Sequence, residues 1–506
     1  MEQTSIKATL ELMRSTWARP NQRDNGEAIK AWTTGTGLVN YDLQRPAIAL
    51  YPWGKEITPL RTETPRVTSA NGDTATRWKA ITGINTTQVP PGLSEGQRGG
   101  LITTTVSPQT AAYVGLGLED NVSFEADYAA EGFDDAKARA VEGLLRSLMI
   151  SEEKMIVGGN SSVALTTTPT PTAAGAATGG ALSDGTYYVG CVALTHDGWS
   201  RATVSAAGAI QTIVRTNADA TTDTINGGTA APSAQSSGVT LNAGTAVQSV
   251  NASVVAVKGA VAYAWYLGSS ASHLYLQKIT TINSVKFTTA YVTSTQDFVL
   301  MAATDNSADA AYSFDGLLYQ GPFKAASGSY YVAQATGVNG TGTGLTTDSA
   351  GGIAELNAMF QSMWDNYRVG PDTLWVNSQE SLNIAAKVIA AGGAPLVRFN
   401  LDGNTENAQM IAGATVGSVL NKVRNELVKV RIHPFMPPGT ILATSKKIPY
   451  PLSGVGNVVQ MKCRREYYQT EWPLRTRKYE FGVYCDEVLQ IYFLPAFGAI
   501  TNIGNA

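Results

Sequence analysis

Histidines, cysteines and paired carboxylates are the residues of this chain that would support catalysis or metal binding. The chain has three histidines: His196, His273 and His433. None has a Cys, Ser or carboxylate at a spacing that predicts a catalytic triad or a metal site. The three cysteines are widely scattered: Cys191, Cys463 and Cys485. They predict neither a disulfide framework nor a metal cluster, and they fit a reducing compartment best.

Acidic and basic groups give no stronger signal for chemistry. Glu152 and Glu153 are adjacent, and we interpret them as a solvated helix face rather than an acid–base pair. Six basic residues cluster near the C-terminus: Lys462, Arg464, Arg465, Arg475, Arg477 and Lys478. We expect them to pair with carboxylates, either across a subunit contact or nearby at Glu466, Glu471 and Glu480. The sequence therefore predicts no enzyme, with no catalytic, cofactor-binding or metal-binding residue.

Composition limits the class of protein. The 506 residues exceed a single core, and only 15% are charged, against about 25% in typical soluble domains. We expect much of so weakly charged a surface to be covered by other copies, although a Thr/Ser-rich adhesin has a similar composition. The net charge of −3 does not favour nucleic acid as a direct ligand. The first residues lack a signal-peptide layout and no apolar run approaches membrane-spanning length, which predicts a soluble protein made in the cytosol.

A long amphipathic helix is predicted from Phe133 to Gly159. Its apolar stripe includes four predicted core residues: Val141, Leu144, Leu145 and Leu148. Two aspartates stand in the first turn and two glycines end the helix. At about 1.5 Å per residue it spans roughly 35–40 Å, so it needs a partner surface along its whole length.

A long hairpin is predicted just before this helix. The run from Thr74 to Ile84 alternates as a strand does, and the Thr/Val-rich run from Leu101 to Leu116 returns beside it. A Pro/Gly-rich tip separates the two runs. Because an isolated hairpin is barely stable in water, we expect this one to lie on another surface. The candidate subunit-contact residues are Arg77, Trp78, Lys79, Pro90 and Pro91.

The remaining segments alternate between two styles. An irregular, proline-punctuated N-terminus predicts an extended arm, with a short helix over Ile6–Trp17. A Thr/Pro/Gly linker at Thr166–Gly180 leads into an all-β module, most simply a sandwich, which we expect to fold autonomously and to project outward. The chain then predicts helices at Gly351–Tyr367 and Gln379–Ala390, and strands at Thr373–Val376, Glu426–Ile432, Thr440–Thr444, Asn457–Tyr467 and Tyr479–Phe493.

The order of these parts resembles the major capsid (major head) proteins of tailed phages, which have the Hong Kong 97-type fold. The stretch Thr76–Asn160, which contains EEKMIVGGN, is similar to the extended loop and spine helix of that family. The segments Ile353–Asn377 and His433–Ile500 are similar to its peripheral and axial domains, including HPFMPPG and REYYQTEWPLRTRKYEFGVY. The all-β module resembles the immunoglobulin-like insertions of some phage capsids.

The resemblance implies an α+β fold with five regions. They are an N-terminal arm at 1–65, an extended loop at 66–131, a peripheral domain with the spine helix at 132–164, 316–369 and 455–506, an inserted immunoglobulin-like β sandwich at 165–315, and an axial domain at 370–454.

The implied function is structural. Many copies would assemble as pentamers and hexamers into an icosahedral shell of the virion, put together in the host cytoplasm around double-stranded DNA that is not bound by sequence. The implied partners are a portal protein and a separate scaffolding or decoration protein, with no cofactor and no membrane. The alternative from another class is a tail-associated or cell-surface adhesin whose β module binds glycan, and an enzyme with an appended carbohydrate-binding module ranks third.

Overall fold

The structure is a computed structural model that describes residues 52–505 apart from 70–71, 86, 132–133, 218–219, 245–246, 391–397, 400–409, 412–415, 449 and 451–452. Most of the predicted arm, including the helix at Ile6–Trp17, lies outside these residues, as does Phe133. The chain divides into two compact units, one of Met1–Leu50 with Ala130–Asp134 and one of Tyr51–Ala129 with Asp135–Ala506. Everything below concerns the second unit.

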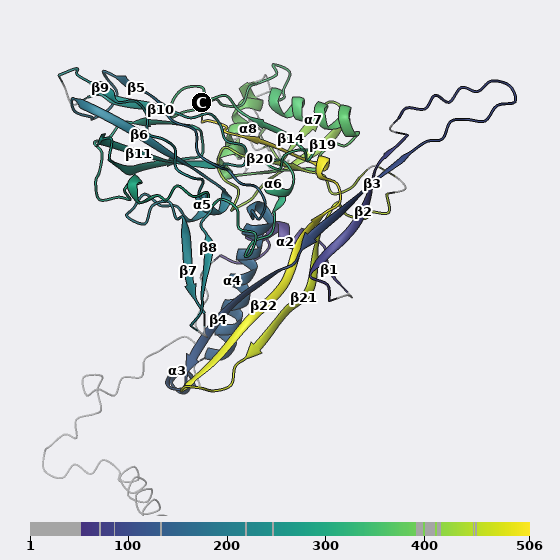
Figure 1. The fold of residues 1–506 in the computed structure, drawn as a ribbon, viewed down its shortest axis with the longest axis horizontal. Coiled ribbons are helices and arrows are strands. Elements are labelled where there is room, and N and C mark those ends of the chain that lie inside the picture. The colour runs from purple at the N-terminus through teal and green to yellow at the C-terminus, as the bar shows by residue number, and fades with distance from the viewer. Residues whose placement is uncertain are drawn as a thin grey trace, which may run out of the picture. The chain divides into compact units, whose positions relative to one another are not determined.

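A four-stranded sheet carries the long helix. Its strands run in the order β1 (Arg66–Thr68), β21 (Val459–Glu471), β22 (Lys478–Ile491) and β4 (Val114–Ser123). Helix α4 (Ala136–Gly158) packs on β4 and β22, and the short helix α2 (Pro59–Glu63) contacts α4 (Figure 1). Helix α3 (Phe124–Ala130) follows β4. The sheet thus brings strands from the N-terminal and C-terminal parts of the described chain together beside α4.

Helix α4 confirms the predicted amphipathic helix. The side chain of Asp135 accepts a hydrogen bond from the backbone N–H of Ala138, so it caps the helix one residue before the first turn. Twenty-three residues give a length of about 34 Å. Leu144 and Leu148 are buried among side chains of β4 and β22, and Val141 and Leu145 pack against them partly buried. The four predicted core residues therefore do face the sheet.

A six-stranded sheet is the second large sheet of the structure. Its order is β14 (Tyr330–Ala333), β23 (Phe497–Thr501), β20 (Ile441–Thr444), β15 (Thr373–Val376), β19 (Glu426–Ile432) and β18 (Ser418–Asn421). A buried core unites this sheet with α7 (Ala354–Tyr367) and α8 (Ser378–Ala390). Nearby lie α6 (Leu317–Gln320) and η3 (Leu494–Ala496), and β16 (Arg398–Phe399) pairs with β17 (Met410–Ile411). The sheet mixes strands from the ranges predicted as peripheral and axial domains.

Residues 165–315 contain two sheets that share one core. The first has the order β13 (Ser284–Phe287), β10 (Ser249–Ser253), β5 (Thr172–Ala176), and the second β12 (His273–Thr280), β11 (Ala262–Ser270), β6 (Gly185–Leu194), β9 (Val239–Leu241). Their inward residues, among them Val250, Trp265 and Cys191, form a single buried cluster. A separate hairpin pairs β7 (Thr212–Thr216) with β8 (Thr222–Asn226), and η2 (Phe298–Leu300) follows. The immunoglobulin-like identity of this region stays a prediction.

One predicted turn in this region is a helix. We expected a hairpin corner at His196-Asp197-Gly198, but α5 (His196–Arg201) begins there. The Thr195 side chain accepts a hydrogen bond from the backbone N–H of Gly198 and so provides an N-cap that the turn-like Asp-Gly pair concealed.

Buried polar contacts join residues 165–315 to the rest of the unit. Asn502, just after β23, accepts from the Asn283 backbone N–H at 2.7 Å and donates to the Asn283 side-chain oxygen at 3.0 Å. The Tyr319 hydroxyl of α6 donates to the Gly259 carbonyl and accepts from the His196 N–H. The region expected to be autonomous therefore shares a buried junction with the six-stranded sheet and α6.

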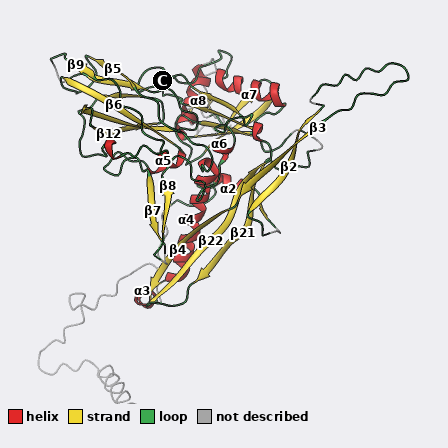
Figure 2. Cartoon of the chain, viewed as in Figure 1, coloured by secondary structure: helices red, strands yellow, loops and turns green. Residues whose placement is uncertain are grey.

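The predicted hairpin is present as β2 (Ala75–Ile84) and β3 (Thr104–Ala112), paired with each other alone among the described strands (Figure 2). Only this central part of the range 66–131 forms the hairpin, because β1 and β4 at its ends belong to the four-stranded sheet. At its base, the Tyr113 N–H donates to the Thr74 carbonyl, and Ala111 and Tyr113 pack on the main core.

Candidate assembly surface and its buried ionic anchor

The β2–β3 hairpin carries a row of exposed apolar side chains. Ile81 and Val106 lie directly opposite each other in the register and are 66% and 49% exposed. Four more exposed apolar residues continue toward and around the tip: Ile84, Leu93, Leu101 and Ile102. A contiguous exposed apolar surface of this kind marks an interaction site. No other described element of the chain pairs with the hairpin along this row.

The residues predicted as subunit contacts divide between the two faces of the hairpin. Arg77 and Lys79 are exposed, and so are Pro90 and Pro91 at the tip. Trp78 faces the other way and is partly buried, with its ring edge-on to Tyr492 of the same chain at 6.0 Å between centroids. Trp78 therefore anchors the base of the hairpin within the subunit. The assignment of these residues to a subunit contact stays a prediction.

Beneath this base lies an ionic cluster that the sequence did not predict. Glu152 and Glu153 of α4, interpreted from the sequence as a solvated face, are fully buried. The amphipathic pattern of the helix did not predict this burial, because the carboxylates turn inward at the end of α4, where α2 and β21 cover them. The correction gives these two glutamates a structural role as anchors for the segment 59–68.

The arginines of this segment supply the counter-charges. Arg66 bridges Glu152 and Glu487, with its Nη2 2.5 Å from Glu487 Oε2. Arg61 Nε lies 2.9 Å from Glu152 Oε2, and the Tyr467 hydroxyl also donates to Glu152. Charge-assisted hydrogen bonds of this type are stronger than those between neutral groups. Without their partners, such buried carboxylates would cost several kcal/mol each.

Glu153 is held by backbone as well as side-chain donors. The N–H groups of Leu60 and Arg61 donate to its two oxygens at 2.9 and 2.7 Å. His433 Nε2 lies 2.6 Å from Glu153 Oε1, while its Nδ1 accepts from the Phe435 N–H at 3.1 Å. The ring is thereby fixed as a donor to Glu153, so the histidine acts as a structural group.

The other two histidines also make structural hydrogen bonds. His196 Nε2 lies 2.7 Å from the Phe435 carbonyl oxygen, and burial lowers the pKa of His196 to about 4. His273 Nδ1 lies 2.6 Å from Asp297. The carboxylate partners of His433 and His273 are distant in sequence, which is why spacing did not show them. Within the described part of the chain, no group of His, Cys, Asp or Glu has the arrangement of a metal site.

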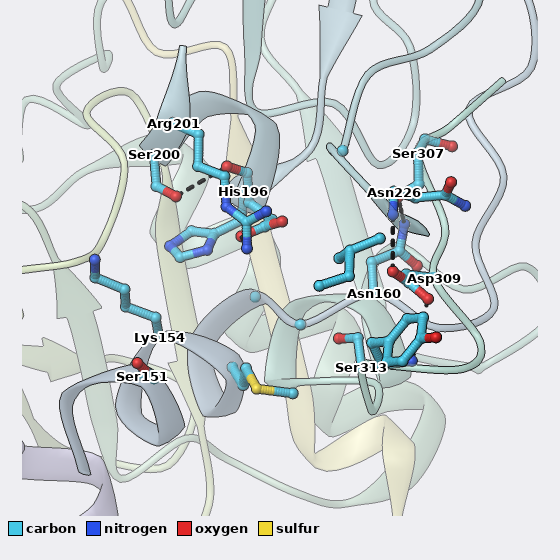
Figure 3. A pocket seen from close by; sticks show the side chains of 17 residues that line it. Ser151, Lys154, Asn160, His196, Ser200, Arg201, Asn226, Ser307, Asp309 and Ser313 are labelled. Carbon is cyan, nitrogen blue, oxygen red and sulfur yellow. Dashed lines mark hydrogen bonds and ion pairs between the residues drawn. The ribbon is translucent and has the colours of Figure 1, made fainter. Parts of the chain in front are cut away.

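A cavity of about 230 Å³ lies where the C-terminal end of α4 meets α5 and β8 (Figure 3). Arg201 and Asp197 form an ion pair across its wall at 3.1 Å. Asp309 accepts from the backbone N–H groups of Asn226 and Tyr312, so its carboxylate shapes the wall. Burial raises the pKa of Asp197. Asp197, Arg201 and Asp309 are thus engaged with each other or with backbone, whereas Lys154 lies over the ring of Phe435.

Two of the six C-terminal basic residues, Arg464 and Arg477, pair with carboxylates, and neither partner is one of the nearby glutamates that we expected. Arg464 lies 2.9 Å from Asp486 on β22, and Arg477 lies 3.0 Å from Glu125 on α3. Arg465 covers the ring of Tyr468. The Arg464–Asp486 pair follows from the pairing of β21 with β22, whereas Arg477 reaches a carboxylate on α3.

Among solved structures, three similar ones illustrate what the chain resembles. The capsid of the native GTA particle aligns with 94% of this chain and 100% of its own at 9% identity and a TM-score of 0.40. The SrpI encapsulin of Synechococcus elongatus aligns with 94% and 95% at 9% identity and a TM-score of 0.40. The capsid of the myovirus phage XM1 aligns with 94% and 100% at 10% identity and a TM-score of 0.39.

The likeness extends over nearly the whole chain but is loose at these TM-scores. No family model and no curated protein matches the sequence. None of the described helices is both long and apolar enough to cross a bilayer.

Proposed function

We propose that this chain is a structural protein whose copies assemble into a closed icosahedral shell around double-stranded DNA in a virion. The observation that carries the proposal is the row of exposed apolar side chains on the β2–β3 hairpin, which has no partner among the described residues of its own chain. A two-stranded hairpin is marginal in water, so a neighbouring copy that covers this row would both stabilise it and link the subunits.

The remaining architecture fits such a building block. The four-stranded sheet and α4 form a packed support below the hairpin, and the ionic cluster holds the chain at the base of that support. The low charge content agrees with a surface that other copies cover. The five predicted regions, the immunoglobulin-like identity of residues 165–315, and the portal, scaffolding or decoration partners belong to the same proposal.

The test places a charge in the exposed row. Ile81→Asp would bury an unpaired carboxylate in the subunit contact, which costs several kcal/mol per contact. We expect folded subunits that no longer form particles, as followed by sedimentation velocity and negative-stain microscopy, with an unchanged circular dichroism spectrum. Val214→Asp is the matched control because Val214 is also an apolar residue of a two-stranded hairpin and is 64% exposed.

Two outcomes would contradict the proposal. Purified wild-type chains that stay monomeric under all assembly conditions would remove the shell-forming function. Normal particles from Ile81→Asp would show that the exposed row does not make the contact.

A further inference from the structure

The ionic cluster under the hairpin contains more negative than positive charge. Three carboxylates, Glu152, Glu153 and Glu487, are fully buried. The two guanidiniums of the cluster, Arg61 and Arg66, pair with Glu152 and Glu487, whereas the side-chain partner of Glu153 is His433. His433 contributes a hydrogen-bond donor to Glu153 while its second nitrogen accepts from backbone. If every carboxylate were ionised, one buried negative charge would lack a counter-charge, an arrangement that proteins avoid by binding a proton.

Glu487 is the carboxylate with an open oxygen. Its Oε2 faces Arg66 at 2.5 Å, whereas its Oε1 is buried and has no hydrogen-bond partner among the described residues. Burial first, and then the neighbouring charge of Glu152, raise the pKa of Glu487 to about 7. The other titratable or charged groups that act on the site come from α2, β1, β21 and β22: Arg61, Arg66, Cys463, Tyr467 and Cys485.

Both arginines belong to one short stretch of chain that leads into the hairpin. Residues 59–68 comprise α2 and β1, and β1 lies parallel to β21 with the Ser69 N–H donating to the Cys463 carbonyl. β2 begins at Ala75, a few residues later. Near the end of α2, Glu63 pairs with Arg431 and with Lys446 at 2.7 Å. The stretch is therefore fixed to the support by charged groups together with the β1–β21 strand pairing and the buried Leu60 side chain.

We propose that residues 59–68 form a strap that docks on the cluster together with one bound proton, carried by Glu487, and that the docked strap positions the base of the β2–β3 hairpin. Arg61 and Arg66 are positioning residues: they touch the buried glutamates and act on the hairpin through the chain. The consequence for assembly rests on the proposed shell-forming function.

The direction of the pH dependence follows from the proton. In the unfolded chain Glu487 loses its proton near its ordinary pKa, whereas in the docked cluster it holds the proton up to about pH 7. The stabilisation that depends on this proton is therefore complete at low pH, fades as the pH rises through this window, and is absent above it. Replacing Glu487 by a side chain of the same shape that cannot ionise removes this loss of stability at high pH.

The first test is Glu487→Gln, which replaces the protonated carboxyl by a neutral group of the same shape. Urea unfolding of unassembled subunits at pH 4.5 and pH 8 gives the ratio of the unfolding constants of wild type and variant. We expect this ratio to be about a hundredfold larger at pH 8 than at pH 4.5. A ratio that is independent of pH, or a variant that is less stable than wild type at pH 8 or does not fold, overturns the proposal.

Trypsin measures the strap itself. Cleavage after Arg66 requires undocking, whereas Arg98 in the exposed tip serves as the internal reference in the same digest. At pH 8 we expect Glu487→Gln to slow cleavage after Arg66 relative to wild type and to leave cleavage after Arg98 unchanged. Equal Arg66 cleavage in the two chains counts against a proton-linked strap.

Arg66→Gln adds a test of the charge count. It leaves an extra buried negative charge, so cleavage after Arg61 should accelerate at least tenfold, and the double variant Arg66→Gln/Glu487→Gln should recover part of that loss. Additive effects of the two substitutions would refute the charge coupling.

Particle counts by negative-stain microscopy at pH 8 separate this proposal from the proposed function. Wild-type chains that form no particles would refute the shell function and leave the strap measurements valid. Particles together with equal cleavage after Arg66 in wild type and Glu487→Gln would refute the strap alone.

Discussion

Asn502→Ala tests whether residues 165–315 depend on the six-stranded sheet. The Asn502 side chain makes three buried hydrogen bonds: from the Asn283 N–H at 2.7 Å, to the Asn283 side-chain oxygen at 3.0 Å, and to the Gln334 carbonyl at 2.6 Å. Each partner left unsatisfied costs about 1–3 kcal/mol, and water that enters the space recovers part of this cost. Asn502 also has φ 60°, where alanine costs about 1–2 kcal/mol. We expect a total loss of about 3–5 kcal/mol.

The assay is urea unfolding followed by tryptophan fluorescence, because Trp265 lies in the core of residues 165–315 and Trp375 in the six-stranded sheet. We expect one transition that moves as a whole to lower urea. Asn502→Gly removes the same hydrogen bonds without the strain at positive φ, so it should lose about 1 kcal/mol less. Asn366→Ala, an exposed asparagine on α7, is the matched control and should change stability by no more than about 0.5 kcal/mol.

Two results would refute this reasoning. A loss below about 1 kcal/mol would show that the junction hydrogen bonds do not contribute net stability. Two separate transitions, with only one of them shifted, would restore the autonomous domain that the sequence predicts.

Three further predictions concern packing and protonation. Leu148→Ala should cost about 2–5 kcal/mol in the free energy of unfolding by urea, because Leu148 is buried in the helix–sheet core; a loss under 1 kcal/mol would contradict that burial. Gly158→Ala should destabilise the chain, since the new Cβ would lie 2.3 Å from His196 Cγ, whereas Gly143→Ala in the same helix meets no atom within 4 Å and should raise the melting temperature; equal shifts would refute the close approach. His196 takes up a proton in the unfolded chain below about pH 6.5 but in the folded chain only near pH 4, so the stability of the fold should decrease as the pH drops between these values. The difference in stability between His196→Gln and the parent should therefore change across this pH window, and a constant difference would disprove the prediction.

The sequence predicted elements well wherever one local pattern decided them. The 3.6-residue period of α4, the alternation of β2 and the compact apolar run of β15 are local, and the structure confirms all three. The equally short strands β14 and β18 were missed because, unlike β15, they are not fully buried, and tertiary pairing makes them strands.

The ionic cluster could not be predicted from local sequence patterns for a different reason. Arg66 and Glu487 are separated by 421 residues, and no spacing rule connects them. The Glu152–Glu153 pair was visible, but its burial depends on α2 and β21, which cover the end of α4. A signal that could have pointed to it is the placement of Arg61 and Arg66 in a proline-rich stretch that holds a larger share of charged residues than the chain as a whole.

The position of Glu487 on β22 has a consequence for synthesis on the ribosome. Glu487 follows Arg66 by 421 residues, so a nascent chain carries Arg66 long before the carboxylate that completes its site exists. At about 5–20 residues per second, the two are made roughly 20–80 s apart. Throughout that interval the strap has no complete cluster to dock on, and the base of the hairpin stays without its anchor. A growing polypeptide thus cannot complete its hairpin anchor before translation has passed β22.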